Sequence, residues 1–449
     1  MRHMRTAGAV ALAGLLAASP TFAIDLIGVH DAALKNDPQL QAASYRRDAT
    51  GENKRQAWSN LLPSLNGSAS ITRGNADTSI AGTQVSSTDT DNQSWGLNLN
   101  QVIYNQANYE KLDIARAQVA QADAIYQSAY QNFLVRVAVS YFNVLTAMDG
   151  VTFAEAEELA LQRQYEQAEQ RFEVGLTAVT DVHEARASYD NARARAIVAR
   201  NALQDAREAL RELTGQYYED LKTLQADLPL VSPTPDDQEQ WVKTALANNP
   251  AVVAAHYGVD IADYTAKLQR SGHYPTLNLT ASYQDFTNNK YLLVSDEQIP
   301  LGTVDLEVQD WRYGLTLNVP LYQGGAVSSR TRQARYELNA TQEDLDAQQR
   351  LTSRQTRDAY RAVIAGIQQV QAFQQALISA ESALEATQAG FEVGTRTIVD
   401  VLLAQQRRFS AQRDNSAARH TYILDHLRLK AAAGILTEDD LQKVNTILK

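Results

Sequence analysis

The chain has 449 residues, including 21 glycines, 10 prolines and no cysteines, which excludes disulfides, thiolate metal sites and a cysteine nucleophile. Glycine and proline usage lies well below the averages of about 7% and 5%, so long uninterrupted helices are expected. With 41 basic and 52 acidic residues the chain is too acidic for a general nucleic-acid binder, and with 21% charged residues it is too polar for a helical membrane protein.

The N-terminus has the pattern of a secretory signal peptide. Arg2 and Arg5 precede an apolar run from Ala7 to Ala18, and small residues stand at the cleavage-reading positions Thr21 and Ala23. The alternative, an N-terminal membrane anchor, needs about 20 apolar residues, more than this run supplies. We expect residues 1–23 to be a signal peptide. No later segment has about 18 apolar residues in a row, so no membrane-spanning helix is expected after it.

The two halves of the chain repeat the same motifs in the same order, which indicates an internal duplication. Asn36-Asp37-Pro38 is echoed by Asn249-Pro250, and Leu62-Pro63-Ser64-Leu65 by Tyr274-Pro275-Thr276-Leu277. The predicted units are a first structural repeat at 24–215, a linker at 216–236, a second repeat at 237–434 and a C-terminal segment at 435–449.

Each half contains two segments of about ten residues in which apolar and small polar residues alternate, so strands are expected at about 64–73, 93–104, 276–287 and 310–322. One apolar face and aromatic residues near the ends are typical of transmembrane β-strands. A soluble half-buried hairpin has the same alternation, and the signal peptide favours the membrane. The polar segments 74–92 and 288–310 are expected to be external loops. The predicted membrane-interface aromatics are Trp95, Tyr104, Tyr283, Trp311, Tyr313 and Tyr322.

Four strands are too few to close a membrane barrel, which needs about eight or more. A sheet edge exposed to lipid is not tolerated, because its backbone groups would have no hydrogen-bond partner. We therefore expect two or more copies of the chain to share one barrel.

Two stretches with few helix breakers, 105–174 and 326–393, predict helices of roughly 100 Å, packed in a coiled-coil-like manner. Return helices are expected at 177–213 and 397–432. The glycines between them, Gly175 and Gly394, suit the left-handed position that ends a helix. Because each long helix follows a strand pair, both turns should lie at the end of the assembly far from the membrane. The expected fold class is mainly α with a membrane β-sheet.

At these residues the chain resembles the TolC family of outer-membrane efflux channels of Gram-negative bacteria. The segments that carry the resemblance are Leu62-Pro63-Ser64-Leu65, 171–175, 180–182, 319–325 and 393–401. It implies a homotrimer with a twelve-stranded outer-membrane barrel and a periplasmic α-barrel, in contact with outer-membrane lipid. It also implies an exit duct of a tripartite efflux pump or type I secretion system, working with an inner-membrane RND or ABC transporter and a periplasmic adaptor.

The resemblance further implies that contacts between neighbouring turns hold the periplasmic mouth shut. Arg396 stands where the family has an arginine that bonds an aspartate, here Asp181, and Phe391 stands where a related chain has a tyrosine. Asp400 is expected to line the mouth, whereas Leu403 replaces a second aspartate. The alternative for Arg396 and Asp181 is a pair of solvated charges, worth less than about 1 kcal/mol even if paired. Asp400 also suits a helix N-terminus on electrostatic grounds alone.

The alternatives to a channel are an adaptor or structural protein and an enzyme. A periplasmic adaptor or structural coiled-coil protein would share the long helices but not the four aromatic-ended strands. An enzyme is not supported, because His183-Glu184 lacks the following histidine of a zincin and no phosphate-binding glycine loop occurs. We expect no catalytic residues, no metal, no cofactor and no nucleic-acid partner.

Overall fold

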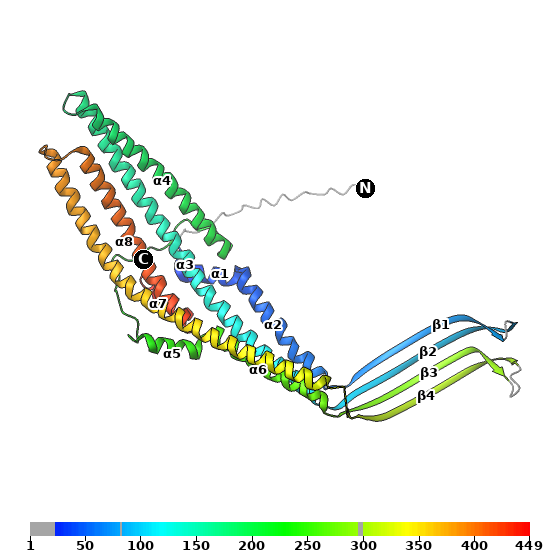
Figure 1. The fold of residues 1–449 in the computed structure, drawn as a ribbon. Helices are drawn as coiled ribbons and strands as arrows, with labels where there is room; N and C mark the ends of the chain where they lie inside the picture. Colours follow the sequence, from blue (N-terminus) through cyan, green and yellow to red (C-terminus); the bar gives the residue numbers. More distant parts are fainter. Residues whose placement is uncertain (1–22, 81–82, 295–299) are drawn as a thin grey trace, which may run out of the picture.

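The computed structural model describes residues 23–80, 83–294 and 300–449, and it consists of long helical rods joined at one end to a four-stranded sheet (Figure 1). The predicted signal peptide lies outside the described residues except for Ala23. The expected fold class, mainly α with an antiparallel sheet of four strands, is confirmed.

The order of elements repeats between the two halves. The first half contains α1 (Leu26–Asn36), α2 (Pro38–Ser59), β1 (Ser64–Ile80), β2 (Thr83–Asn105), α3 (Gln106–Glu173) and α4 (Val179–Thr214). The second contains α5 (Gln238–Asn248), α6 (Pro250–Arg270), the short 3₁₀ helix η1 (Ser271–His273), β3 (Thr276–Val294), β4 (Pro300–Asn318), α7 (Ala326–Glu392) and α8 (Ile398–Ala432). The last helix is α9 (Glu438–Asn445).

The repeated Asn/Asp-Pro motifs start equivalent helices. Asp37 caps α2 by accepting a hydrogen bond from the Gln39 N–H at 2.9 Å, and Asn249 caps α6 through the Ala251 N–H at 2.9 Å. Pro38 and Pro250 each follow in the first helical turn, where proline loses no helical hydrogen bond. The same local chemistry therefore sets the direction of the rod in both halves.

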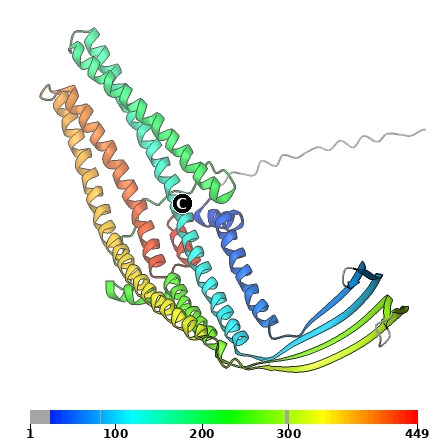
Figure 2. The same ribbon diagram turned by 45° about the vertical axis from the view of Figure 1, so that its right-hand side comes forward.

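Helices α3 and α7 run the whole length of the helical part (Figures 1 and 2). The 68 residues of α3 correspond to roughly 100 Å at about 1.5 Å per residue. Helix α2 packs against α3 near the sheet and α4 packs against it near the tip, while α8 packs against α7 and α6 contacts both α3 and α7. The shorter helices thus form composite rods beside the two long ones.

The strands are longer than the alternation predicts. The pairing of β1 with β2 continues from Thr72 opposite Asn92 to Ile80 opposite Thr83, with a register shift between Thr78 and Ser79. The expectation that 74–92 and 288–310 are loops is therefore wrong for most of their described residues, which form strand. Polar sequence does not prevent pairing, because the ladder is made by backbone groups whatever the side chains are.

The last strand ends earlier than expected. Strand β4 stops at Asn318 rather than at 322, so Tyr322 lies in the segment that leads to α7. Pro320 cannot donate to a strand ladder, and Gly324 and Gly325 have φ values of +59° and +79°. These three residues turn the chain from the sheet into the long helix.

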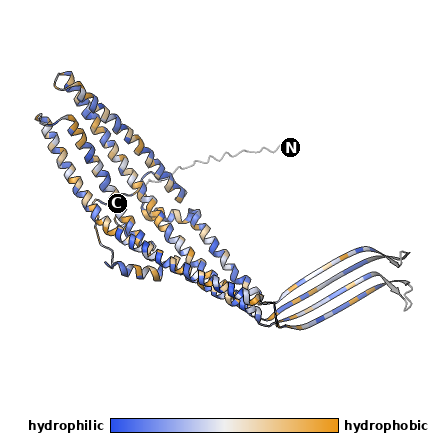
Figure 3. Ribbon diagram, viewed as in Figure 1, coloured by the Kyte–Doolittle hydropathy of each residue, from blue (hydrophilic) through white to orange (hydrophobic). Residues whose placement is uncertain are grey.

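The main hydrophobic core lies midway along the rods, where α1, α3, α8 and the end of the chain meet. It includes Leu26, Phe133, Tyr141 and Leu427, all almost completely buried. The Tyr141 hydroxyl donates to the Lys222 carbonyl oxygen at 2.7 Å and so joins the linker to α3. Hydrophilic and hydrophobic residues are interleaved along the rest of the helices and along the strands (Figure 3).

Part of the apolar surface of α3 lies in this core. Of the described helices, α3 alone is long and apolar enough to cross a membrane by length and composition. Phe133, Leu134 and Val137 of this helix are fully buried against other helices. Helices in protein cores meet the same criterion, so one such helix is weak evidence for a membrane span.

A glycine at the end of α8 provides a test of this packing. Gly434 has a φ of +73°, and a β-carbon there would come within 2.5 Å of the Asn248 carbonyl oxygen. We expect Gly434→Ala to destabilise the protein by about 2 to 4 kcal/mol, through backbone strain and a backbone clash. Gly215→Ala is the matched control, because Gly215 has a φ of +71° with only an ordinary 3.5 Å contact. Thermal unfolding in detergent should show a clearly smaller loss for the control; equal losses would contradict the clash.

Candidate functional site

Strand register gathers the apolar side chains of the sheet on one face. Leu97 lies opposite Tyr283, and Tyr283 lies opposite Trp311, so the three share a face. The aliphatic members of that face include Leu65, Ala69, Ile71, Leu97, Leu99, Leu279, Leu315 and Leu317. The other face carries mainly amide and hydroxyl side chains, among them Asn66, Ser68, Ser70, Asn98, Asn100, Thr280, Ser282, Thr316 and Asn318. One apolar and one polar face is the arrangement of a membrane barrel wall.

Aromatic side chains flank the aliphatic part of this face at two levels. At the outer level, the Trp95 and Tyr283 ring centroids are 5.1 Å apart, and Trp311 and Tyr313 are 73% and 84% exposed. A polar pair lies at the level of Trp95, where Asp285 stands opposite Trp95 and accepts a hydrogen bond from Gln309.

At the level near the helices, a bulge between Val102 and Tyr104 places Tyr104 opposite Leu277. The Tyr104 ring lies 6.5 Å from that of Tyr109 on α3. Tyr322 is 86% exposed in the segment after β4. Two aromatic levels separated by aliphatic residues match the two interfaces of a lipid bilayer.

The sheet has two open edges. Its strand order is β1-β2-β3-β4, and within the described part of the chain β1 pairs only with β2 and β4 only with β3. The backbone N–H and C=O groups along the outer sides of β1 and β4 therefore need partners from outside this chain if the sheet is in lipid.

At the opposite end of the rods, each helical hairpin closes through the same turn. Gly175 and Gly394 have φ values of +75° and +79°, the left-handed conformation expected of them. The Leu176 N–H donates to the Arg171 carbonyl oxygen at 2.8 Å, and the Thr395 N–H donates to that of Gly390 at 2.8 Å. These are Schellman turns, which satisfy the last carbonyl groups of α3 and α7.

Asp400 lies in a capping box at the start of α8. Its carboxylate accepts hydrogen bonds from the N–H and the hydroxyl of Thr397, both at 2.9 Å. The Thr397 N–H is the largest cause that lowers the pKa of Asp400, followed by the Thr397 hydroxyl and then by the charge of Arg396. The Thr397-x-x-Asp400 spacing is a signal that sequence analysis could have used. Leu403, one turn further on and 43% exposed, lines a groove between α8 and α4.

Asp181 and Phe391 are brought together at a small gap between the two hairpin tips, which Thr177 and Arg171 also line. Asp181 accepts a hydrogen bond from the Thr177 hydroxyl, and the Arg171 guanidinium lies 5.0 Å from the centre of the Phe391 ring.

Arg396 makes no ion pair with Asp181 among the described residues of this single chain. Its stem instead lies over Gly390, where a β-carbon would come within 2.8 Å.

Below the tips, a small apolar cluster joins the two hairpins. It consists of Leu161, Ala168, Ala185, Ala192, Ile398 and Leu402, with Phe391 packed against it. Further from the tip, Glu157 of α3 is fully buried and accepts hydrogen bonds from Arg195 of α4 and Arg413 of α8. Sequence analysis missed this cluster, because its three residues are brought together only by the packing of separate helices.

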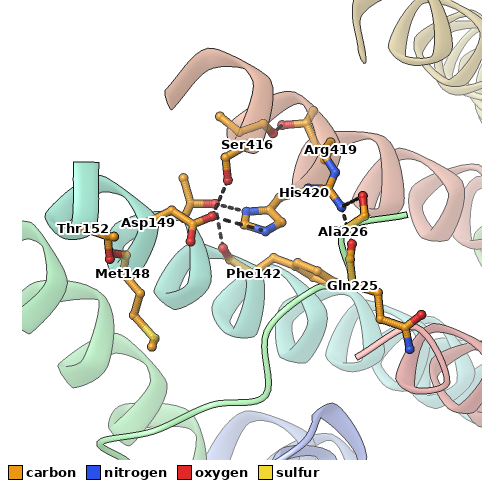
Figure 4. Close-up of polar contacts among 12 residues, drawn as sticks. Phe142, Met148, Asp149, Thr152, Gln225, Ala226, Ser416, Arg419 and His420 are labelled. Atoms are coloured by element: carbon orange, nitrogen blue, oxygen red, sulfur yellow. Dashed lines mark hydrogen bonds and ion pairs between the residues drawn. The ribbon is translucent and has the colours of Figure 1, made fainter. Parts of the chain in front are cut away.

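A second polar contact lies beside the main core (Figure 4). The His420 Nδ1 of α8 is 2.8 Å from the Thr146 hydroxyl of α3, and its Nε2 is 3.9 Å from the Asp149 carboxylate. Burial lowers the pKa of His420 to about 4, against the opposing charge of Asp149, so the ring is neutral at neutral pH. Arg419 donates to the Ala226 carbonyl oxygen at 3.0 Å and holds the linker here. No group of three or more His, Asp or Glu side chains suited to a metal occurs in the part of the chain that the structure describes.

Comparisons with known proteins match this architecture. Residues 29–216 and 241–435 match the family described as outer membrane efflux protein. The outer membrane protein TolC of Vibrio cholerae is 39% identical, over 96% of this chain and 95% of that protein. TolC of Escherichia coli is 34% identical, over 94% of this chain and 85% of that protein. The alkaline protease secretion protein AprF of Pseudomonas aeruginosa is 30% identical, over 96% and 88% respectively.

Solved structures share the fold. The channel CusC superposes with a TM-score of 0.78 at 19% identity, covering 92% of this chain and 93% of that chain. The outer membrane protein VceC of Vibrio cholerae gives a TM-score of 0.74 at 20% identity, covering 91% and 96%. The repeat of motifs in the two halves, the sheet with one apolar face and the sequence identity all point to the same family. The chain belongs to the TolC family of non-enzymatic outer-membrane efflux and secretion channels.

Proposed function

We propose that three copies of this chain form a continuous duct, with a shared twelve-stranded barrel in the outer membrane and a helical tunnel in the periplasm. The duct would conduct drugs, other small molecules or secreted proteins from an inner-membrane RND or ABC transporter, joined through a periplasmic adaptor, to the exterior. The relative AprF is named for alkaline protease secretion, which supports the inclusion of proteins among the proposed cargo. A passive duct needs no catalytic group of its own.

The open-edged, one-sided sheet is the observation that supports this proposal most directly. Strands β1 and β4 each leave one edge without a partner in the described chain, while the adjoining face carries exposed apolar side chains such as Trp311 and Leu315. Further copies would pair β4 of one chain with β1 of the next and bury both edges. An adaptor or structural coiled-coil protein without a pore has no use for such a sheet.

We further propose that the hairpin tips are the gate, with Asp181, Arg396 and Phe391 in the contacts that close it and Asp400 and Leu403 at the mouth. The turns lie at the end of the rods away from the sheet (Figure 1). Phe391 and Asp181 already share one gap. Arg396 has no ion-pair partner among the described residues and is exposed, so it is free to bond Asp181 of a neighbouring chain in the assembly.

The assembly itself can be tested on the purified protein. We expect it to fractionate with the outer membrane, to migrate as a heat-modifiable trimer, and to form pores in planar bilayers, because only a closed barrel satisfies the sheet edges. A monomer recovered from the soluble periplasmic fraction would overturn the proposed function.

Arg396→Ser should make the closed channel leakier, because it removes the cation proposed to hold neighbouring tips together. Conductance of the purified variant in planar bilayers should rise relative to wild type, with unchanged trimer content on gels as the control for assembly. An unchanged closed-state conductance would remove Arg396 from the gate.

Asp400→Ala should weaken block by a multivalent cation added from the periplasmic side, because a trimer presents three copies of this carboxylate around one axis. The hydrogen bonds from Thr397 lower the pKa of Asp400 below its ordinary value, so the carboxylate keeps its charge at pH values where a free aspartate has begun to take up a proton. Block of the wild type should therefore persist to a lower pH than an aspartate of ordinary pKa would allow. Equal block of Asp400→Ala and wild type would show that the Asp400 carboxylates do not bind the blocking cation.

A further inference from the structure

Glu157 has an unusual environment for a carboxylate. Its side chain is 0% exposed, its Oε1 accepts a hydrogen bond from Arg195 Nη2 at 2.8 Å, and its Oε2 accepts one from Arg413 Nη1 at 3.3 Å. Arg195 lies on α4, in the same hairpin as Glu157, whereas Arg413 lies on α8 in the other hairpin. One buried carboxylate thus joins the α3/α4 hairpin to the α7/α8 hairpin.

Within the described residues, the other ion pairs near the tips do not join the hairpins. Arg200 pairs with Glu155 at 2.8 Å and Glu158 at 3.5 Å, all within α3 and α4, and Arg408 pairs with Glu381 at 3.6 Å between α8 and α7. Among the ion pairs of the described residues, Glu157–Arg413 is the one nearest the tips that connects the two hairpins.

Glu157 also lies at an interruption in the apolar packing. On α3 the main core ends at Leu145 and the tip cluster begins at Leu161. Between them the buried residues of α3 are Ala154 and Glu157. Apolar contact fixes no unique position along a helix, because it is not directional, whereas paired hydrogen bonds to a charge do.

Loss of the Glu157–Arg413 contact differs from loss of the Glu157–Arg195 contact. If α8 moves away from α3, Arg413 is already 33% exposed and can be hydrated, while Glu157 keeps Arg195 from its own hairpin. The buried carboxylate is therefore never left without a partner, which is the costly state for a buried charge. The arrangement allows the contact with Arg413 to break and re-form reversibly.

We propose that Glu157 is a positioning residue for the gate, holding Arg413 of α8 in the closed position and remaining paired with Arg195 when α8 moves away. This inference rests on the proposed function, since it assumes that the tips open and close. The contact lies further from the turns that carry Asp181, Arg396 and Asp400 than the apolar cluster that also joins the hairpins.

Arg413→Met is the direct test, because it removes the inter-hairpin bond, keeps most of the apolar stem and leaves Glu157 paired. We expect the ratio of open to closed channels in planar bilayers to rise about tenfold, as loss of one hydrogen bond to a charge would give. Arg413→Lys, which retains the charge, should lie between this variant and wild type.

Arg195→Met and Arg200→Met are the matched controls, since each removes an arginine that pairs within the first hairpin. A merely structural role for the cluster would make Arg195→Met and Arg413→Met alike in both heat stability and conductance. We expect Arg195→Met to lose heat stability without any rise in conductance, and Arg200→Met to behave as wild type.

Wild-type conductance for Arg413→Met, or an equal rise for Arg195→Met, would overturn the inference. Should Arg413→Met fail to assemble, Glu157→Gln weakens the same contact because a neutral amide replaces the charged acceptor, and conductance equal to wild type would overturn the inference equally. A wild-type protein that forms no pore contradicts the proposed function instead. If Arg396→Ser raises conductance while Arg413→Met does not, the gate stands and the role of Glu157 fails.

Discussion

The organisation of this protein depends on one constraint, the need of every backbone N–H and C=O group in a lipid environment for a hydrogen-bond partner. The sheet presents an apolar face suited to lipid, yet β1 and β4 leave open edges within the described chain. In the proposed trimer these edges pair between chains. In that proposal a single chain is an incomplete unit, and each of its rods is part of a larger wall.

In the helical part, rods of roughly 100 Å are held together by little hydrophobic surface. Burial is concentrated in the main core around Phe133 and Tyr141 and in the smaller cluster at Leu161 and Ile398. Polar contacts such as Asp149 with His420 and Glu157 with Arg413 connect α3 to α8 between and beside these clusters. The extended apolar core holds the middle of the molecule, the small apolar cluster joins the hairpins nearer the tips, and the Glu157–Arg413 contact lies between the two.

Much of the fold could be predicted because its signals are local. The repeated proline motifs, the alternation of Leu97 and Leu99 with asparagines, and the glycines at 175 and 394 each act within a few residues. The extent of the strands could not, because pairing beyond Thr72 is decided by a neighbouring strand and not by side-chain alternation. The predicted strand end at Tyr322 is wrong for another reason, because β4 stops at Asn318 and Pro320 cannot donate to a strand ladder.

The sequence by itself determined the helix lengths, the duplication, the two-faced strands and the turns, because each depends on near neighbours in the chain. Resemblance added the family and the residues expected at the gate. Only the tertiary structure decided which side chains meet across helices. Glu157, Arg195 and Arg413 lie on three different helices, and no spacing rule relates them. Their proximity is set by how α3, α4 and α8 pack. The buried charge that connects the two hairpins could therefore be found only in the folded chain.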